Sequence, residues 1–110
     1  METTIKDKVL QLPGVEYFGE YEGMLKYLER KGNPLFGIEG DLNLRDSKIK
    51  SLENLTSVGG DLYLVGTKIE SLGNLTSVGK GLYLRGTPLS KKYSVAQIRQ
   101  MVDVEGVIYV

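Results

Sequence analysis

Residues 40–59, GDLNLRDSKIKSLENLTSVG, are followed directly by residues 60–79, GDLYLVGTKIESLGNLTSVG. This first copy and second copy are identical at 14 of 20 positions, and residues 81–89, GLYLRGTPL, begin a third copy. A fixed period of this length is typical of stacked repeats, in which each unit buries its apolar side against its neighbours. The sequence therefore predicts one core that grows by stacking copies of a short unit.

Each copy begins with an alternating pattern that predicts a short strand. Two leucines flank a third residue in 42–44, 62–64 and 82–84, and such alternation indicates a strand with one buried face. A residue that tolerates a positive φ angle follows each strand, namely Asp46, Gly66 or Gly86. Because equivalent residues lie one repeat apart, the strands must be parallel, in register and about 4.8 Å apart.

The remainder of each copy predicts an outer arc that turns apolar side chains inward without forming a helix. The inward residues are Leu52, Leu55 and Val58 in the first copy and Leu72, Leu75 and Val78 in the second. One buried leucine contributes about 2 kcal/mol, whereas ordering one residue's backbone costs about 1–2 kcal/mol. Two and a half copies are therefore too few to stand alone, and we expect further structure at both ends.

Residues 1–38 are expected to form a helical cap before the repeats. Residues 20–31 place four apolar side chains on one helical face: Tyr21, Met24, Leu25 and Leu28. Gly32 and Pro34 end that helix. A shorter helix, containing Ile5, Val9 and Leu12 and closed by Pro13-Gly14, is expected before it.

Residues 91–110 predict a helix and a last strand. Ser94 and Gln97 have the spacing of a capping box, and the expected buried face of the helix consists of Val95, Ile98, Met101 and Val102. Val107–Val110 aligns with 81–84 as a fourth parallel strand, reached by a right-handed helical crossover. The whole chain is thus expected to be one α/β domain with a parallel sheet of about four strands: a cap at 1–38, repeats at 39–90 and a C-terminal unit at 91–110.

The run Leu62-x-Leu64-x-x-Thr67-x-Ile69-x-x-Leu72 resembles the leucine-rich repeat, L-x-L-x-x-N-x-L-x-x-L, and residues 42–52 match it equally well. In that family the asparagine forms a ladder of hydrogen bonds between neighbouring units. Hydroxyl residues replace it here, and we expect them to make part of that ladder: Ser47, Thr67 and Thr87. The motif G-T-x-I/L and the capped C-terminal helix resemble those of short repeat proteins of bacteria and bacteriophages. The resemblance implies a small solenoid that binds a protein on its concave sheet face and has no enzymatic activity. It also implies an inhibitor or adaptor, such as a phage protein that blocks a host defence factor in the host cytoplasm.

One column of side chains points away from the expected core and is the candidate binding surface. It consists of Asn43, Tyr63, Tyr83 and Tyr109, with Asp41 and Asp61 on one side and Arg45 and Arg85 on the other. Stacked tyrosines bordered by charged groups are typical of protein interfaces. The alternative is that the tyrosines only pack on one another and stiffen the sheet. We predict that the partner-binding residues are Asn43, Tyr63, Tyr83, Tyr109, Arg45, Arg85 and Asp61.

Two carboxylates one repeat apart, Asp41 and Asp61, raise the alternative of a shared cation or an acid/base pair. The third copy has Gly81 at this position and closes no such site. We expect each carboxylate to accept hydrogen bonds from turn backbone beside its own strand. Asn54 and Asn74 match the glycosylation sequon, and we interpret them as repeat residues whose amides satisfy the outer arc.

The composition excludes several classes of function. The chain has no cysteine and no histidine, and its formal charge is zero, so neither disulfides nor thiolate chemistry is available. No phosphate-binding loop or metal-ligand spacing is present, and we expect no cofactor, no metal and no enzymatic activity. The opening residues are too polar for a signal peptide and no apolar run is long enough for a membrane span, which predicts a cytoplasmic protein.

Two other classes of partner stay open. A single strand of nucleic acid could use the tyrosines and Lys91-Lys92, although the acidic column and the zero net charge disfavour it. The last strand leaves one edge of the sheet uncovered, which predicts a homodimer or a self-assembling structural protein that pairs through this C-terminal edge.

Overall fold

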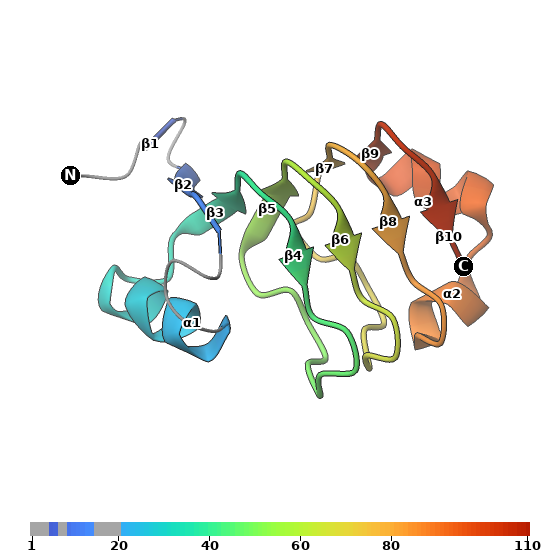
Figure 1. Ribbon diagram of the computed structural model, residues 1–110, viewed down its shortest axis with the longest axis horizontal. Coiled ribbons are helices and arrows are strands. Elements are labelled where there is room, and N and C mark those ends of the chain that lie inside the picture. Colours follow the sequence, from blue (N-terminus) through green and yellow to red (C-terminus); the bar gives the residue numbers. More distant parts are fainter. Residues whose placement is uncertain (1–4, 7–8, 15–20) are drawn as a thin grey trace.

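The computed structural model, shown in Figure 1, describes residues 5–6, 9–14 and 21–110. These residues form an α/β protein with two parallel sheets of short strands and three helices. The front sheet contains β4 (Leu42–Asn43), β6 (Leu62–Tyr63), β8 (Leu82–Tyr83) and β10 (Ile108–Tyr109). The back sheet contains β2 (Val9–Leu12), β3 (Leu35–Ile38), β5 (Leu55–Val58), β7 (Ser77–Val78) and β9 (Asp103–Val104), with β1 (Ile5–Lys6) antiparallel at its edge. The helices are α1 (Tyr21–Arg30), α2 (Pro88–Lys92) and α3 (Val95–Met101).

The front sheet confirms the predicted register. Leu42 pairs with Leu62, Leu62 with Leu82, and Leu82 with Ile108, all in parallel. The backbone ladder continues just beyond the assigned strands, because Leu44 N donates to the Tyr63 carbonyl at 2.9 Å and Leu64 N to the Tyr83 carbonyl at 2.8 Å. The predicted turn residues take the expected backbone geometry, with φ values of 58° at Asp46, 77° at Gly66 and 78° at Gly86.

The back sheet was not predicted. The outer arc is not merely irregular chain, because β5 and β7 lie side by side within it and pair through Ser57–Ser77 and Val58–Val78. The apolar residues Leu55 and Val58 are three positions apart, so this segment shows no two-residue alternation to reveal a strand. Glycine at the turn between the sheets lets the copies stack closely, since a Cβ at Gly79 would collide with the Gly59 carbonyl oxygen.

The N-terminal region is partly as expected. The predicted helix is confirmed as α1, which buries Met24 and Leu28 and ends before Gly32, whose φ is 87°. The shorter helix expected before it is wrong, because Val9–Leu12 forms β2 and pairs in parallel with β3. Leu10 and Leu12 are both buried, so the two-residue alternation decides the structure over the helical spacing of Val9 and Leu12. The rest of that expectation concerns residues 1–4, 7–8 and 15–20, which lie outside the described residues.

The C-terminal unit confirms the capping box and the last strand. Ser94 Oγ accepts from Gln97 N at 3.2 Å, and Gln97 Oε1 accepts from Ser94 N at 2.9 Å. Ile98 and Val102 are buried as expected, but Met101 is 42% exposed, so its place on the buried face was wrong. Helix α3 has seven residues, which make about two turns. After α3 the chain forms β9 in the back sheet and then β10 in the front sheet.

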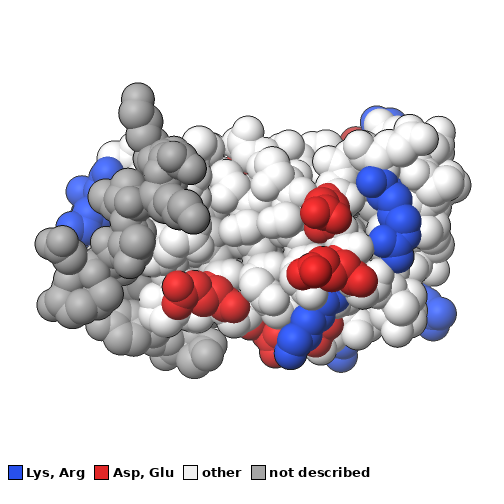
Figure 2. Space-filling model, turned by 90° about the horizontal axis from the view of Figure 1, so that it is seen from above, with Lys and Arg blue, Asp and Glu red and all other residues white. Residues whose placement is uncertain are grey.

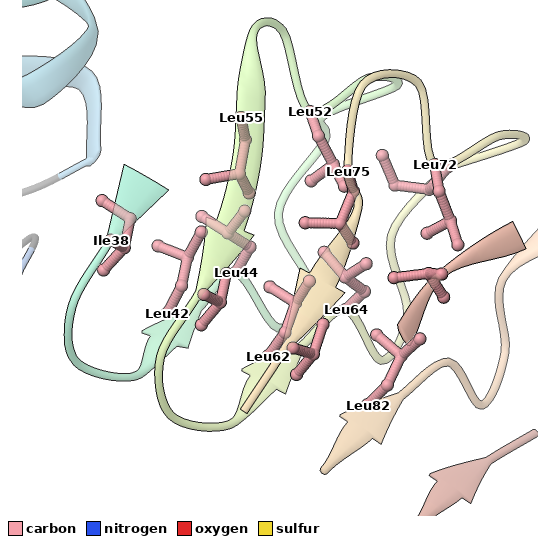
Figure 3. Close-up of a cluster of buried hydrophobic side chains, with 14 of the residues drawn as sticks. Ile38, Leu42, Leu44, Leu52, Leu55, Leu62, Leu64, Leu72, Leu75 and Leu82 are labelled. Atoms are coloured by element: carbon pink, nitrogen blue, oxygen red, sulfur yellow. The ribbon is translucent and has the colours of Figure 1, made fainter. Parts of the chain in front are cut away.

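The core lies between the two sheets. Figure 3 shows leucines from the front and back strands pointing toward one another, in rows that repeat from copy to copy. The front row contains Leu42, Leu62 and Leu82, each with no exposed surface. The described helices are ten residues long or shorter, and none of them is long and apolar enough to cross a membrane.

Candidate functional site

The three tyrosines of the front sheet form a continuous stack of rings, which we call the tyrosine stack. The centroids of Tyr63 and Tyr83 are 4.6 Å apart with an interplanar angle of 18°. Those of Tyr83 and Tyr109 are also 4.6 Å apart, with an angle of 8°. The register of β6, β8 and β10 produces this arrangement, because neighbouring strands place equivalent side chains about 4.8 Å apart, close to aromatic stacking distance.

An arginine covers one end of the stack. The Arg45 guanidinium carbon lies 4.9 Å from the centroid of Tyr63, a cation–π contact. Asn43 occupies the tyrosine column in β4 without a ring, and its Oδ1 accepts a hydrogen bond from Arg45 N at 3.1 Å. Both faces of Tyr63 and of Tyr83 are therefore covered, and the stack presents ring edges and hydroxyl groups to the surroundings. Tyr109, which is 43% exposed, is the ring at the other end.

The two aspartates bind backbone rather than forming a cation site. Asp41 Oδ1 accepts from Asp61 N at 2.7 Å, and Asp61 Oδ1 accepts from Gly81 N at 2.8 Å. The backbone belongs to the next copy and not to each residue's own strand, so that detail of the expectation was wrong. Within the described ranges, no group of three or more His, Cys, Asp or Glu is placed to hold a metal ion. The aspartates instead tie neighbouring copies together beside the tyrosine stack.

The surroundings of Tyr63 and Tyr83 raise the pKa of both hydroxyls. Burial raises the pKa of Tyr63, and the carboxylates of Asp61 and Asp41 raise it further, while Arg45 lowers it. Burial also raises the pKa of Tyr83, followed by Asp61 and the neighbouring tyrosines. Tyr63 Oη lies 3.4 Å from Asp61 Oδ2, to which it donates. At neutral pH Tyr63 and Tyr83 are therefore neutral hydrogen-bond donors, and Asp61 lies beside them.

The structure brings most of the predicted binding residues together. Asn43, Tyr63, Tyr83 and Tyr109 share one column, with Arg45 and Asp61 in direct contact with Tyr63. Arg85 is exposed at the end of β8, where its carbonyl accepts from Gly66 N at 3.0 Å. It lies in the same flanking column as Arg45 and belongs to the same face.

The hydroxyls that follow the front strands do not bond neighbouring copies, so that expectation was wrong. Thr67 Oγ1 donates to the Leu64 carbonyl at 2.8 Å, and Thr87 Oγ1 donates to the Leu84 carbonyl at 2.6 Å, each within its own copy. Ser47 Oγ is buried and has no hydrogen-bond partner in the part of the chain that the structure describes. The γ-methyl group of threonine restricts its χ1 angle. Serine has no such group, so the χ1 angle of Ser47 is less restricted than that of Thr67 or Thr87.

The ladder between copies lies on the outer arc instead. Asn54 Nδ2 donates to the Asn33 carbonyl at 2.8 Å, and Asn74 Nδ2 donates to Asn54 Oδ1 at 3.3 Å. Thr76 Oγ1 likewise donates to the Thr56 carbonyl at 3.0 Å. The interpretation of Asn54 and Asn74 as repeat residues is confirmed. The segment NLTSVG is identical in both copies, and this identity was the sequence signal for the contact between Thr76 and Thr56.

A pocket beside the stack was missed by sequence reasoning. It has a volume of about 570 Å³ and lies between α1 and the first copy, where its lining includes Tyr21, Asn43, Arg45, Ser47 and Lys48. Burial, followed by the charge of Glu53, raises the pKa of Tyr21 to about 12. No local sequence pattern joins Tyr21 to residues of the first copy, so only the packing of α1 could reveal this pocket.

The rim where the two sheets meet carries charges of both signs. Figure 2 shows carboxylates gathered on this face with a few basic side chains among them. A groove of about 500 Å³ near this rim is lined by Glu39, Asp103 and Glu105 together with small residues of the back sheet. The described part of this face therefore presents no continuous basic surface for a phosphate backbone.

Comparisons of the chain with models of protein families, with curated proteins and with solved structures found no match.

Proposed function

We propose that the chain is a short leucine-rich-repeat-like solenoid that acts without enzymatic activity, by binding another protein through its front sheet. The tyrosine stack is the observation that carries this proposal. Its rings are held rigidly by the sheet register and by one another, so binding would cost little further side-chain entropy. Tyrosine and arginine are also the residue types most enriched at the energetic centres of protein interfaces.

The exposed chemistry of the stack favours a protein over a nucleic acid. Bases of a single strand stack on open aromatic faces, whereas both faces of Tyr63 and Tyr83 are covered by neighbouring groups. The accessible edges and hydroxyls suit hydrogen bonds and apolar contacts with a polypeptide. Asp61 beside the rings would also repel phosphates. The resemblance to short repeat proteins of bacteria and bacteriophages makes an inhibitor of a host protein, acting in the host cytoplasm, the most specific form of the proposal.

Pairing of two copies through β10 is a second candidate. β10 is the outermost strand of the front sheet, and three of the exposed large apolar side chains in the described residues lie within or next to it: Val107, Tyr109 and Val110. An exposed strand edge with apolar flanks is suited to pairing with a second edge. Light scattering over a range of concentrations tests this candidate, and a monomer at high concentration would count against it.

The main test compares wild type with a Tyr63→Ser, Tyr83→Ser double variant. Proteins captured by wild type from a bacterial lysate are purified, and their affinity for both forms is measured by calorimetry. We expect the double variant to lose binding while keeping the wild-type circular dichroism spectrum, because both side chains point away from the core. A Ser57→Ala, Ser77→Ala variant of the back sheet is the matched control and should bind normally. Equal affinity of wild type and the tyrosine variant would refute the proposal.

A further inference from the structure

The first copy departs from the second in the residues that line the pocket next to α1. Asn43 stands in the tyrosine column, so no ring follows Tyr63 at this end of the stack. Arg45 replaces the equivalent Val65, and Ser47 replaces Thr67. All three replaced positions line the pocket of about 570 Å³. Its volume lies within the range of sites that hold a small ligand or one anchoring side chain.

The polar groups of this pocket are mainly hydrogen-bond donors. Among the described residues of the lining, Arg45 and Lys48 bring two positive charges and Glu22 brings one carboxylate. Glu53 lies outside the lining but close enough for its charge to act on Tyr21. The Arg45 guanidinium carbon lies 4.9 Å from the centroid of the Tyr63 ring, and the side chain has five N–H donors for hydrogen bonds. Tyr21 Oη and Ser47 Oγ are both buried, and neither has a hydrogen-bond partner among the described residues. Buried polar atoms of this kind are usually satisfied, and both belong to residues of this lining.

Apolar side chains complete the lining. Leu25, Leu44 and Ile49 belong to it, and Leu44 is buried in the core. The pocket therefore joins an apolar wall to a set of donors with net positive charge. A ligand that matches both must carry an anionic acceptor next to an apolar body.

We propose that this pocket binds a carboxylate that lies beside an apolar side chain on the partner protein, and so anchors one end of the segment that crosses the tyrosine stack. The pocket and the stack form one surface, since Asn43 and Arg45 belong to both. The inference rests on the proposed function for the nature of the partner. The chemistry of the pocket itself can be tested on the isolated chain. Because the pKa of Tyr21 is raised to about 12, its hydroxyl is a donor at every physiological pH.

The test uses small probes of defined charge and NMR spectra of the ¹⁵N-labelled chain. N-acetyl-phenylalanine carries a terminal carboxylate, and N-acetyl-Glu-Phe-amide carries a side-chain carboxylate next to the same ring. N-acetyl-phenylalaninamide is the neutral control. We expect one or both carboxylate probes to shift the amide signals of Asn43, Arg45 and Ser47, and the neutral probe to bind about tenfold more weakly or worse. The probe that binds more tightly identifies the source of the carboxylate.

The repeat supplies matched variants. Lys48→Gln and Arg45→Gln remove one positive charge each from the pocket, whereas Lys68→Gln removes the charge from the position equivalent to Lys48 outside it. We expect the pocket variants to weaken probe binding about tenfold, and Lys68→Gln to change it less than twofold. Arg45→Gln also removes the contact with Tyr63, whereas Lys48→Gln leaves the tyrosine stack unchanged. If the two pocket variants give different results, the result of Lys48→Gln is the one that tests the inference.

Two results would overturn the inference: equal binding of the neutral and charged probes, or equal effects of Lys48→Gln and Lys68→Gln. Its failure is distinguishable from failure of the proposed function. If the tyrosine double variant loses the partner but no carboxylate probe binds, the pocket inference is wrong and the proposed function stands. If the probes bind as expected but the tyrosine variant keeps its partner, the proposed function is wrong.

Discussion

Equivalent residues of the first and second copies pair with one another in both sheets. The two copies nevertheless present different side chains at the surface. The residues they share build the stack of copies: the leucines of the core, the glycines of the turns, and the asparagine and threonine of the outer ladder. Three of the six residues that differ line the pocket in the first copy, namely Asn43, Arg45 and Ser47, and the other three are Asp46, Lys50 and Glu53. A repeat can thus keep its packing fixed while single positions specialise the surface. The comparison can be tested one position at a time.

The largest expected effect comes from the shared core. Leu42 and Leu62 are equivalent and both are completely buried, so Leu→Ala at either site should destabilise the chain by about 2–5 kcal/mol. The two values should agree closely if the copies pack alike. Urea denaturation followed by circular dichroism measures both. A cost at one site less than half that at the other would show that the copies differ in the core as well as on the surface.

The largest pH-dependent effect should belong to the first copy, because Tyr21 lines a pocket with residues of this copy. The folded-state pKa of Tyr21 is about 12, against 10.0 in its ordinary state, because of burial and then Glu53, which the second copy replaces by Gly73. The unfolded chain releases this proton near pH 10 and the folded chain does not. The contribution of Tyr21 is therefore complete below pH 10 and is lost as pH rises from 10 through 12, by about 2–3 kcal/mol.

Tyr21→Phe is the variant that checks this pH dependence. Its hydroxyl has no partner in the described residues, so the substitution should be nearly neutral at pH 7. Stability measured between pH 9 and 12 should fall less steeply than in wild type. Parallel pH curves for the two proteins would contradict the assigned burial of Tyr21.

A smaller difference is expected at the hydroxyl after each front strand. Thr67→Val removes a buried hydrogen bond to the Leu64 carbonyl, which should cost about 1–2 kcal/mol. Ser47→Ala removes a buried hydroxyl that has no partner within the described ranges, and this change should be neutral or slightly stabilising. Thermal unfolding of the two variants compares them directly. A loss of stability in Ser47→Ala as large as that in Thr67→Val would show that Ser47 is bonded after all.

The smallest expected effect follows from making the first copy more like the second. Asn43→Tyr places a fourth ring beside Tyr63 and competes with Arg45 for the same ring face. The gain in stacking and the loss of the cation–π contact oppose each other, so the melting temperature should change by less than about 4 °C. Near-ultraviolet circular dichroism should report the additional stacked tyrosine. An unchanged spectrum would mean that the column cannot be extended into the first copy.

Local sequence patterns were sufficient for the parts of the molecule that repeat. The register of Leu42, Leu62, Leu82 and Ile108 follows from the repeated pattern, and the positive φ angles after the strands and the capping box of α3 follow from short local patterns. The candidate surface followed as well, because a known register places every outward residue of the front sheet. Patterns failed where two spacings competed. Residues 9–12 read as helix by one spacing and as strand by another, and hydrogen bonding to β3 favoured the strand.

The sequence by itself determined the repeat period, the parallel register and, through them, the column in which the tyrosines lie. These features depend on residues a fixed distance apart, and a periodic chain repeats the same short-range energies in every copy. Only the tertiary structure decided the back sheet, the strand at 9–12 and the pocket beside α1. Each of these depends on which distant segment supplies hydrogen bonds or covers a side chain, and the local pattern of a single chain does not contain that information.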